Sequence, residues 1–208
     1  MLANNIYTNE RVSEYLSIGF APIPVKLKAK EPIGRWKELQ ISRDDVGKYF
    51  DGAPVNIGIV TGTRSGGLVD VDIDAPAALR FGPYFLPKTD CVFGHESKPE
   101  SHWVYRVKHP ESIEQFRADG MIVEVRGNAH YTVFPGSVHE SGELIEFEDR
   151  NNIKPCSSDW KELVCAASKV AIATLLFEAW TPGQRHDLAL ATAAKLARLG
   201  WRRDEVRI

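Results

Sequence analysis

The stretch Gly66-Gly67-Leu68-Val69-Asp70-Val71-Asp72-Ile73-Asp74-Ala75-Pro76 decides the fold prediction, because apolar and acidic residues alternate strictly within it. Alternate side chains of a β-strand share one face, so this strand has an apolar face and an acidic face. The apolar face carries Val69, Val71 and Ile73, and the acidic face carries Asp70, Asp72 and Asp74. β-Branched residues fit a half-buried strand, whereas Asp is disfavoured there.

The acidic face needs a physical explanation, because its carboxylates lie roughly 6–7 Å apart along the strand. Each neighbouring pair repels by about 2–3 kcal/mol at an effective dielectric constant of ~20. The face is therefore either fully solvated, as on a polar edge strand, or neutralised by a cation. A row of hard oxygen ligands is what Mg²⁺ or Mn²⁺ prefers.

Composition places the chain among ordinary globular proteins. It has 208 residues, 43 % hydrophobic and 26 % charged, with a formal net charge of −2, so any surface that binds a polyanion must be local. The three widely spaced cysteines, Cys91, Cys156 and Cys165, form neither a disulfide framework nor a zinc-ligand set and suit a reducing cytoplasm. No apolar run is long enough for a membrane span, and we expect no membrane partner.

The remaining patterns predict a mixed α/β body followed by helices. We expect helices over residues 7–18, 42–50 and 110–116, and strands over 20–25, 56–60, 92–94, 102–107, 121–127, 130–135 and 144–147. The glycine-rich segment 61–67 connects two strands, and we expect a hairpin that leads into the acidic strand. From residue 158 the sequence is helical, so we predict one domain over 1–157 and, over 158–208, the start of a helical unit in a longer protein.

Two further strands carry residues that suit phosphate chemistry. His102 begins a strand after a polar loop, and Glu124 and Arg126 share one face of the strand over 121–127. Carboxylates from two strands can hold two divalent ions about 3.5–4 Å apart, the two-metal geometry of phosphoryl transfer. His102 and Arg126 would then contact phosphate oxygens.

These residues resemble the three signatures of the archaeo-eukaryotic primase superfamily. Asp72-Ile73-Asp74, Ser101-His102 and Glu124 have the order and spacing of the signatures, most closely those of the primase–polymerase domains of plasmids, phages and mobile elements. The resemblance covers roughly residues 10–150, and flanking segments agree with it. Those segments are 56–62, 123–127, 135–142 and Lys30-Glu31-Pro32 with Trp36.

The resemblance implies an α+β fold: an RRM-like antiparallel sheet with an N-terminal α/β subdomain, followed by a helical C-terminal segment. It implies that Asp72, Asp74 and Glu124 are metal ligands and that His102 binds the phosphates of the incoming nucleotide. Asp70-Val71-Asp72 also fits the first signature, so Asp70 remains an alternative ligand. Further candidate nucleotide contacts are Lys98, Ser101, Arg126 and His139.

The activity implied is that of a template-directed nucleotidyltransferase, a DNA polymerase with DNA primase activity that uses Mg²⁺ or Mn²⁺ at a two-metal site and no zinc. Its partners would be a DNA template and primer, dNTPs or NTPs, and a replicative helicase fused to it or working with it. The setting implied is the replication of a plasmid, phage or mobile element in a prokaryotic cytoplasm. The segment Trp180-Thr181-Pro182-Gly183-Gln184-Arg185-His186 resembles the start of the helical domain that links such modules to helicases.

Two other functions use the same residues. A metal-dependent nuclease or replication initiator would need the carboxylates and a nucleophile, for which Tyr105 and Tyr131 are available. A non-catalytic nucleic-acid-binding module would leave the acidic face in water.

Overall fold

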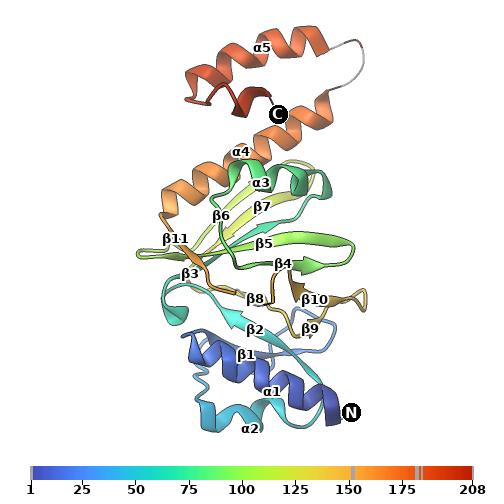
Figure 1. Ribbon diagram of the computed structural model, residues 1–208, viewed down its shortest axis with the longest axis vertical. Coiled ribbons are helices and arrows are strands. Elements are labelled where there is room, and N and C mark those ends of the chain that lie inside the picture. Colours follow the sequence, from blue (N-terminus) through green and yellow to red (C-terminus); the bar gives the residue numbers. More distant parts are fainter. Residues whose placement is uncertain (1, 151–152, 181–182, 184, 208) are drawn as a thin grey trace.

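The computed structural model describes residues 2–150, 153–180, 183 and 185–207, arranged around two β-sheets (Figure 1). The helices are α1 (Leu2–Ser17), α2 (Val46–Phe50), α3 (Gly82–Phe85), α4 (Trp160–Ala179) and α5 (Arg185–Arg198). Short 3-10 turns cover Arg43–Asp45, Thr63–Ser65, Pro76–Phe81 and Glu205–Arg207. In Figure 1, α1 and α2 lie below the strands and α4 crosses above them, with α5 beyond α4.

The small sheet is antiparallel and has the order β1-β2-β8. Its strands are β1 (Ala21–Lys26), β2 (Val55–Val60) and β8 (Tyr131–Val133). Pro22 and Pro24 lie in β1, which pairs only with β2 among the described strands. An edge strand is where proline is tolerated, because its missing N–H removes no bond from the middle of a sheet.

The large sheet has the order β6-β7-β3-β5-β4-β10-β9, with β11 pairing parallel to β5. Its strands are β3 (Leu68–Ile73), β4 (Val92–His95), β5 (Lys98–Val107), β6 (Ile113–Arg117), β7 (Met121–Arg126), β9 (Ser137–Val138), β10 (Leu144–Phe147) and β11 (Cys156–Ser158). In the register of β3 with its two neighbours, Asp72 lies opposite both His102 and Glu124. Three functional candidates therefore form one row across the centre of the sheet.

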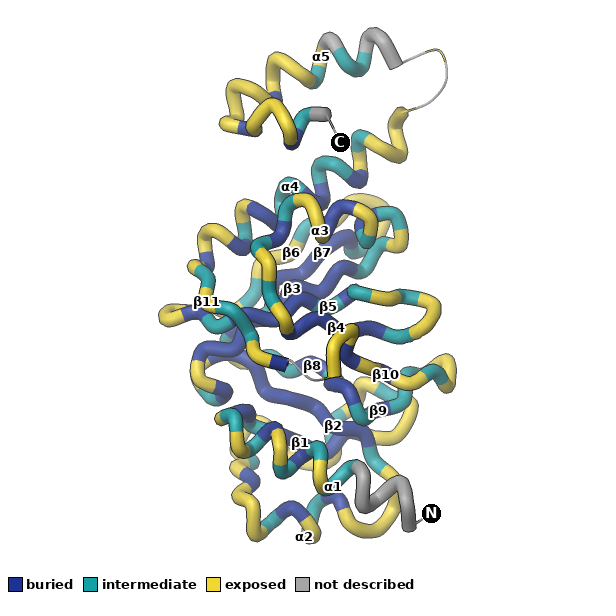
Figure 2. Tube along the Cα trace, in the orientation of Figure 1, coloured by how far each residue is buried: buried dark blue, intermediate teal, exposed yellow. Residues whose placement is uncertain are grey.

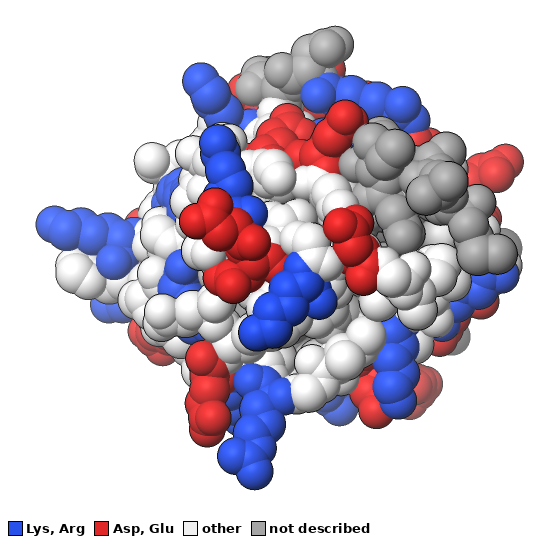
Figure 3. All heavy atoms as spheres, turned by 90° about the horizontal axis from the view of Figure 1, so that it is seen from below, with Lys and Arg blue, Asp and Glu red and all other residues white. Residues whose placement is uncertain are grey.

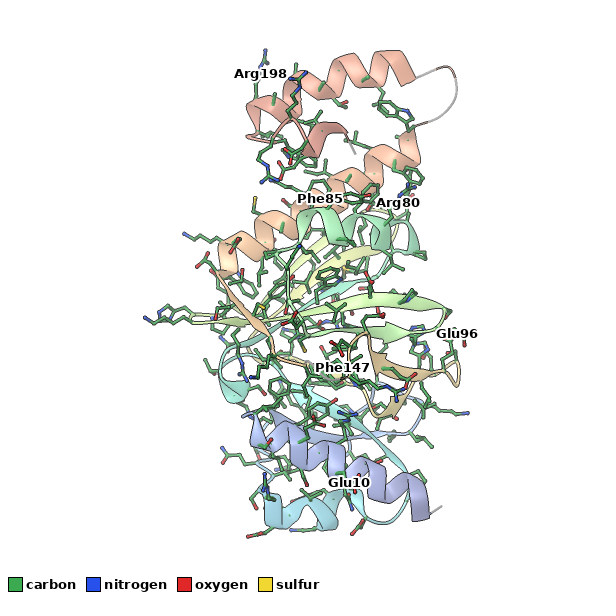
Figure 4. The ribbon with its side chains drawn as sticks, in the orientation of Figure 1. Glu10, Arg80, Phe85, Glu96, Phe147 and Arg198 are labelled. Atoms are coloured by element: carbon green, nitrogen blue, oxygen red, sulfur yellow. The ribbon has the colours of Figure 1, made fainter. Side chains whose placement is uncertain are left out.

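The two faces of β3 have different neighbours, as the alternation predicts. Val69, Val71 and Ile73 pack in the core between the large sheet and α4, where Trp160 and Leu163 are buried. The other face looks toward the small sheet, with a second core beside it that includes Phe134 and Phe147. Figure 2 shows the central strands buried almost throughout, and Figure 4 shows the Phe147 side chain inside the molecule. The acidic face of β3 is therefore interior.

The predicted α+β class and antiparallel sheet are confirmed, but two local expectations are wrong and one of the two explanations of the acidic face is excluded. Residues 113–117 form strand β6 rather than a helix, because they pair along β7 at the edge of the sheet. β2 and β3 do not form a hairpin: they belong to different sheets, and only a single bridge, Gly62 to Leu68, joins their connection to β3. β3 is not a solvated edge strand, since it pairs on both sides.

The glycine-rich connection separates the two sheets by turning the chain sharply. Gly62, Gly66 and Gly67 all have positive φ, which residues with a Cβ rarely adopt. At Gly67 an added Cβ would lie 2.1 Å from the carbonyl oxygen of Val107. The sequence shows the glycines but not the direction in which they send the chain.

The predicted helical C-terminal segment is confirmed as α4 and α5. Asp159 caps α4, because its side chain accepts hydrogen bonds from the backbone N–H of Lys161 and Glu162. The N-terminal half of α4 packs on the large sheet, so its apolar face belongs to the same core as β3. The division at residues 157 and 158 stays a prediction, and Thr181, Pro182 and Gln184 of the proposed linker lie outside the described residues.

Candidate active site

A cavity of about 610 Å³ opens between the two sheets. Strands of both sheets line it, with Asn56 and Thr132 from the small sheet and Asp72 from the large one. Among the predicted site residues, those that line it are Asp72, Lys98, Ser101, His102, Arg126 and His139. At the end of the molecule that carries α1 and α2, acidic and basic side chains are interspersed (Figure 3). The charge of that surface therefore does not indicate a binding site for polyanions.

Three carboxylates converge beside this cavity. Asp72 on β3, Asp74 just after β3 and Glu124 on β7 each place one oxygen within 4.8 Å of the others. The backbone N–H of Asp74 donates to the carbonyl of Ile122 at 2.8 Å, and this bond holds the end of β3 against the start of β7. Antiparallel pairing of two acidic strands thus brings together residues that are 50 positions apart in the sequence.

Arg126 is the main counter-charge to the carboxylates. Its guanidinium lies 2.6 Å from Asp72 Oδ2, 2.5 Å from Glu124 Oε2 and 3.6 Å from Asp70 Oδ2. Lys98 Nζ lies 3.5 Å from Asp74 Oδ1. Desolvation disfavours the charged guanidinium, yet the three carboxylates outweigh burial and raise the pKa of Arg126.

The carboxylates differ in how strongly they hold protons. Burial alone would raise the pKa of Asp72, but the charges of His102 and Arg126 outweigh burial and lower it. Burial raises the pKa of Asp74, and the charge of Asp72 adds to that rise. The surroundings therefore favour the ionised form of Asp72 more than that of Asp74, and a bound cation would favour the ionised form of both.

Asp70 is fully buried and already has partners. Its Oδ2 accepts a hydrogen bond from the hydroxyl of Thr132 at 2.6 Å, and both its oxygens lie 3.2 Å from His102 Nδ1. Asp72 Oδ1, in contrast, is buried and has no hydrogen-bond partner among the described residues. The oxygen with spare bonding capacity in this cluster thus belongs to Asp72, not Asp70.

His102 is held by contacts on two sides. Its ring stacks on Phe93, with centroids 4.6 Å apart and planes 16° apart, and its Nδ1 faces Asp70. Burial disfavours the protonated ring, but the charges of Asp72 and Asp70 outweigh burial and raise the pKa of His102. With Nδ1 directed at Asp70, Nε2 is the nitrogen left for a ligand in the cavity.

The other predicted contacts lie in different parts of the cavity. Ser101 is buried, and its hydroxyl has no hydrogen-bond partner among the described residues. Glu100, just before it, has a positive φ of 50°, which marks an irregular backbone where β5 begins. His139 does not join the carboxylates: it stacks against His95 instead.

Several residues of the site carry no signal in the sequence. Thr132 belongs to the small sheet, and Gln115 Nε2 donates to Glu124 Oε1 from β6, which the sequence predicts as a helix. His95 and Glu143 pair across the end of β4 and the β9–β10 turn. Only the strand order and register bring such residues to the site, so a single sequence could not reveal them.

The tyrosines that a nuclease would need are engaged elsewhere. Tyr105 lies in the core shared with α4, and its hydroxyl donates to the carbonyl of Pro87 at 2.7 Å. Tyr131 donates to the carbonyl of Lys30 at 2.7 Å. The solvated acidic face of a non-catalytic module is likewise absent, since Asp70 and Asp72 are buried.

The site thus combines a mixed α+β domain with carboxylates from two antiparallel strands beside a cleft. The family model described as bifunctional DNA primase/polymerase, N-terminal, matches residues 12–160, so the chain belongs to the Prim-Pol family. Membership supports a primase/polymerase role in replication, with DNA and nucleotides as substrates. No curated protein matches the chain. Among the described residues, no helix is long and apolar enough to cross a membrane.

Proposed function

We propose that this domain is a metal-dependent, template-directed nucleotidyltransferase that extends DNA primers and makes them. The observation that carries the proposal is the convergence of Asp72, Asp74 and Glu124 within 4.8 Å beside a cavity of about 610 Å³. We further propose that the domain serves replication of a plasmid, phage or mobile element in a prokaryotic cytoplasm, fused to or working with a helicase.

The chemistry of this cluster fits hard divalent cations. All the candidate ligands are carboxylate oxygens, which Mg²⁺ and Mn²⁺ prefer, and Asp72 Oδ1 is a buried acceptor without a hydrogen-bond partner among the described residues. When bound, two such ions would lower the pKa of the attacking 3′-hydroxyl and stabilise the leaving pyrophosphate. Asp72, Asp74 and Glu124 would hold them, with Asp70 assigned to orienting His102.

The basic residues of the cleft have roles that follow from their partners. His102, fixed by Asp70 and Phe93, presents Nε2 to a phosphate oxygen of the incoming nucleotide. Arg126 and Lys98 pair with carboxylates of the cluster, and we assign both to the nucleotide phosphates when cations neutralise those carboxylates. The hydroxyl of Ser101, which has no hydrogen-bond partner among the described residues, provides a further donor at the wall of the cleft.

The test is extension of a primed template with dNTPs, in Mg²⁺ and in Mn²⁺, by Asp72→Asn and Glu124→Gln. Both substitutions keep the size of the side chain and remove a metal-ligand charge, so we expect extension to be lost. Asp119→Asn and Glu114→Gln are matched controls, because both residues are exposed and lie outside the cluster. Extension at the wild-type rate by either cluster variant would refute the proposal, as would loss of extension in the controls alone.

A second assay without a primer separates the two activities. Wild-type protein should form short products on single-stranded template from nucleotides alone, and Asp72→Asn should not. Extension without any primer synthesis would restrict the proposal to the polymerase activity.

A further inference from the structure

A second group of side chains, separate from the carboxylate cluster, lies at the same cavity. His95 at the end of β4 and His139 from the turn between β9 and β10 line the cavity, and Glu143 from the same turn completes the group without lining it. Figure 4 shows the neighbouring residue Glu96 at the outer end of the β4–β5 hairpin, and the His95 side chain is 12 % exposed. Neither His95 nor Glu143 has a part in the chemistry proposed above.

Glu143 is the anchor of this group. Its Oε2 lies 2.6 Å from His95 Nδ1 and accepts hydrogen bonds from the hydroxyls of Ser97 at 2.7 Å and Ser141 at 2.9 Å. Its Oε1 accepts a bond from the backbone N–H of Ser97 at 3.0 Å. These bonds lower the pKa of Glu143 to about 2, the Ser97 hydroxyl being the largest cause. A carboxylate with this many partners positions His95 rather than binding a ligand itself.

The hydrogen bonds leave the same nitrogen free on both imidazoles. His95 directs Nδ1 at Glu143, and His139 Nδ1 accepts from the backbone N–H of Ser141 at 3.3 Å and lies 2.9 Å from its hydroxyl. Nε2 is therefore the nitrogen that each ring leaves for a ligand, and it is a hydrogen-bond donor whenever it carries the proton. Burial and the neighbouring His95 lower the pKa of His139.

The stacking of the two rings distinguishes between a metal and an anion as ligand. The ring centroids are 4.1 Å apart and the planes are 13° apart. The lone pairs of imidazole lie in the ring plane, so two parallel rings cannot both direct them at one ion between them. Two N–H groups side by side suit the oxygens of a phosphate instead. The charged groups around the pair are Lys30, Lys98, Glu96, Glu140 and Glu143.

The position of the pair relates it to the carboxylates. His95 lies opposite Lys98, whose Nζ reaches Asp74, and Phe93, two residues before His95, lies opposite His102. Strand spacing of about 4.8 Å and a rise of about 3.3 Å per residue place the backbone of His95 about 12 Å from that of Asp72. His102 and Lys98 therefore lie between the carboxylates and this pair, along the path that a triphosphate chain would take.

We propose that His95 and His139, held by Glu143, form a subsite for the terminal phosphate of a nucleoside triphosphate. The inference rests on the proposed function, because it takes the carboxylate cluster as the place of the α-phosphate. The subsite makes binding depend on the number of phosphates. It also receives one end of the pyrophosphate product.

The experiment measures binding rather than catalysis. Dissociation constants for dATP, dADP and dAMP are measured by calorimetry with Ca²⁺ as the cation, for the wild type, His95→Gln, His139→Gln and Glu143→Gln. We expect wild-type protein to prefer dATP over dADP, and each histidine variant to lose about 10- to 100-fold of dATP affinity, as for the loss of one charge-assisted hydrogen bond. Affinity for dAMP should not change.

His109→Gln is the matched control, because His109 is exposed and does not line the cavity. Thermal unfolding of each variant separates loss of binding from loss of fold, and Glu143→Gln retains both histidines while removing their anchor. An unchanged preference for dATP over dADP in the folded histidine variants overturns the inference. So does stoichiometric Zn²⁺ binding by the cluster with no effect on dATP. If the wild type prefers dATP over dADP but does not extend primers, the proposed function alone is refuted.

Discussion

Replacing Arg126 with Gln tests whether the carboxylates of β3 and β7 are a cation site. The substitution removes the guanidinium that lies within 2.6 Å of Asp72 and Glu124 and leaves the carboxylates facing one another. At a separation of 4.8 Å and an effective dielectric constant of ~20, two carboxylates repel by about 3.5 kcal/mol. Removing one partner of a buried ion pair costs about 3–5 kcal/mol.

The Arg126 side chain is 19 % exposed, so we take the lower end of that range, about 3 kcal/mol, as the loss of unfolding free energy in EDTA. For a domain of this size, 1 kcal/mol changes Tm by about 2–4 °C, which predicts a fall of about 6–12 °C. The fall in Tm should be much smaller in Mn²⁺, because an ion at 100 times its Kd adds about 2.7 kcal/mol to the free energy of unfolding. The variant should also bind the ion more tightly than the wild type does.

The assay is thermal unfolding of wild type and Arg126→Gln in EDTA and across a Mn²⁺ titration. Arg150→Gln is the control, because Arg150 forms an exposed pair with Glu146 whose loss should cost no more than about 0.5 kcal/mol. Equal destabilisation of Arg126→Gln in EDTA and in saturating Mn²⁺ would refute the reasoning and make Arg126 purely structural. No destabilisation in EDTA would show that the carboxylates do not need a counter-charge.

Three further predictions concern the surroundings of the site. Thr132→Val removes the only hydrogen bond from a hydroxyl to buried Asp70 among the described residues, and it should lower the free energy of unfolding in urea by about 1.5–3 kcal/mol. A loss below about 0.5 kcal/mol would mean that Asp70 has another donor. Folding lowers the pKa of Glu143, so the ionised side chain stabilises the fold above pH 4.5, and this stabilisation is lost as the pH falls toward 2. The unfolding free energies of wild type and Glu143→Gln should therefore converge on acidification, and a constant difference from pH 7 to pH 3 would contradict this. Gly67→Ala puts a Cβ at positive φ against the Val107 carbonyl and should lower stability by at least about 1–2 kcal/mol, whereas Gly120→Ala, with open space around it, should not.

The sequence predicts those elements whose apolar residues recur with the period of a strand or a helix. Strands β3, β5 and β7 and helices α4 and α5 follow from apolar spacing, and each lies where its pattern places it. β6 does not, because Glu114 and Gln115 suit an exposed strand edge as well as a helix, and pairing with β7 decides between the two. The direction of the chain after Gly62 is likewise set by tertiary packing.

The candidate site was predictable only as separate motifs. Asp72, His102 and Glu124 can be picked from the sequence, but their alignment in one row depends on the order β7-β3-β5 and on a register that no single strand encodes. A shift of one residue would turn Glu124 to the opposite face. Residues that support the motifs from other elements, such as Thr132 and Glu143, need the folded chain to be found.

Under the proposed function, the partners of Arg126 would link metal loading to nucleotide binding. The guanidinium contacts Asp72 and Glu124 and supplies positive charge to both, so in this arrangement it is engaged by carboxylates. If divalent ions take over that charge, the guanidinium is released at the wall of the cavity, next to the place where phosphates would lie. Cations and nucleotide would then bind with positive coupling, because each removes the repulsion that the other would meet. A site with a fixed, independent arginine would show no such coupling.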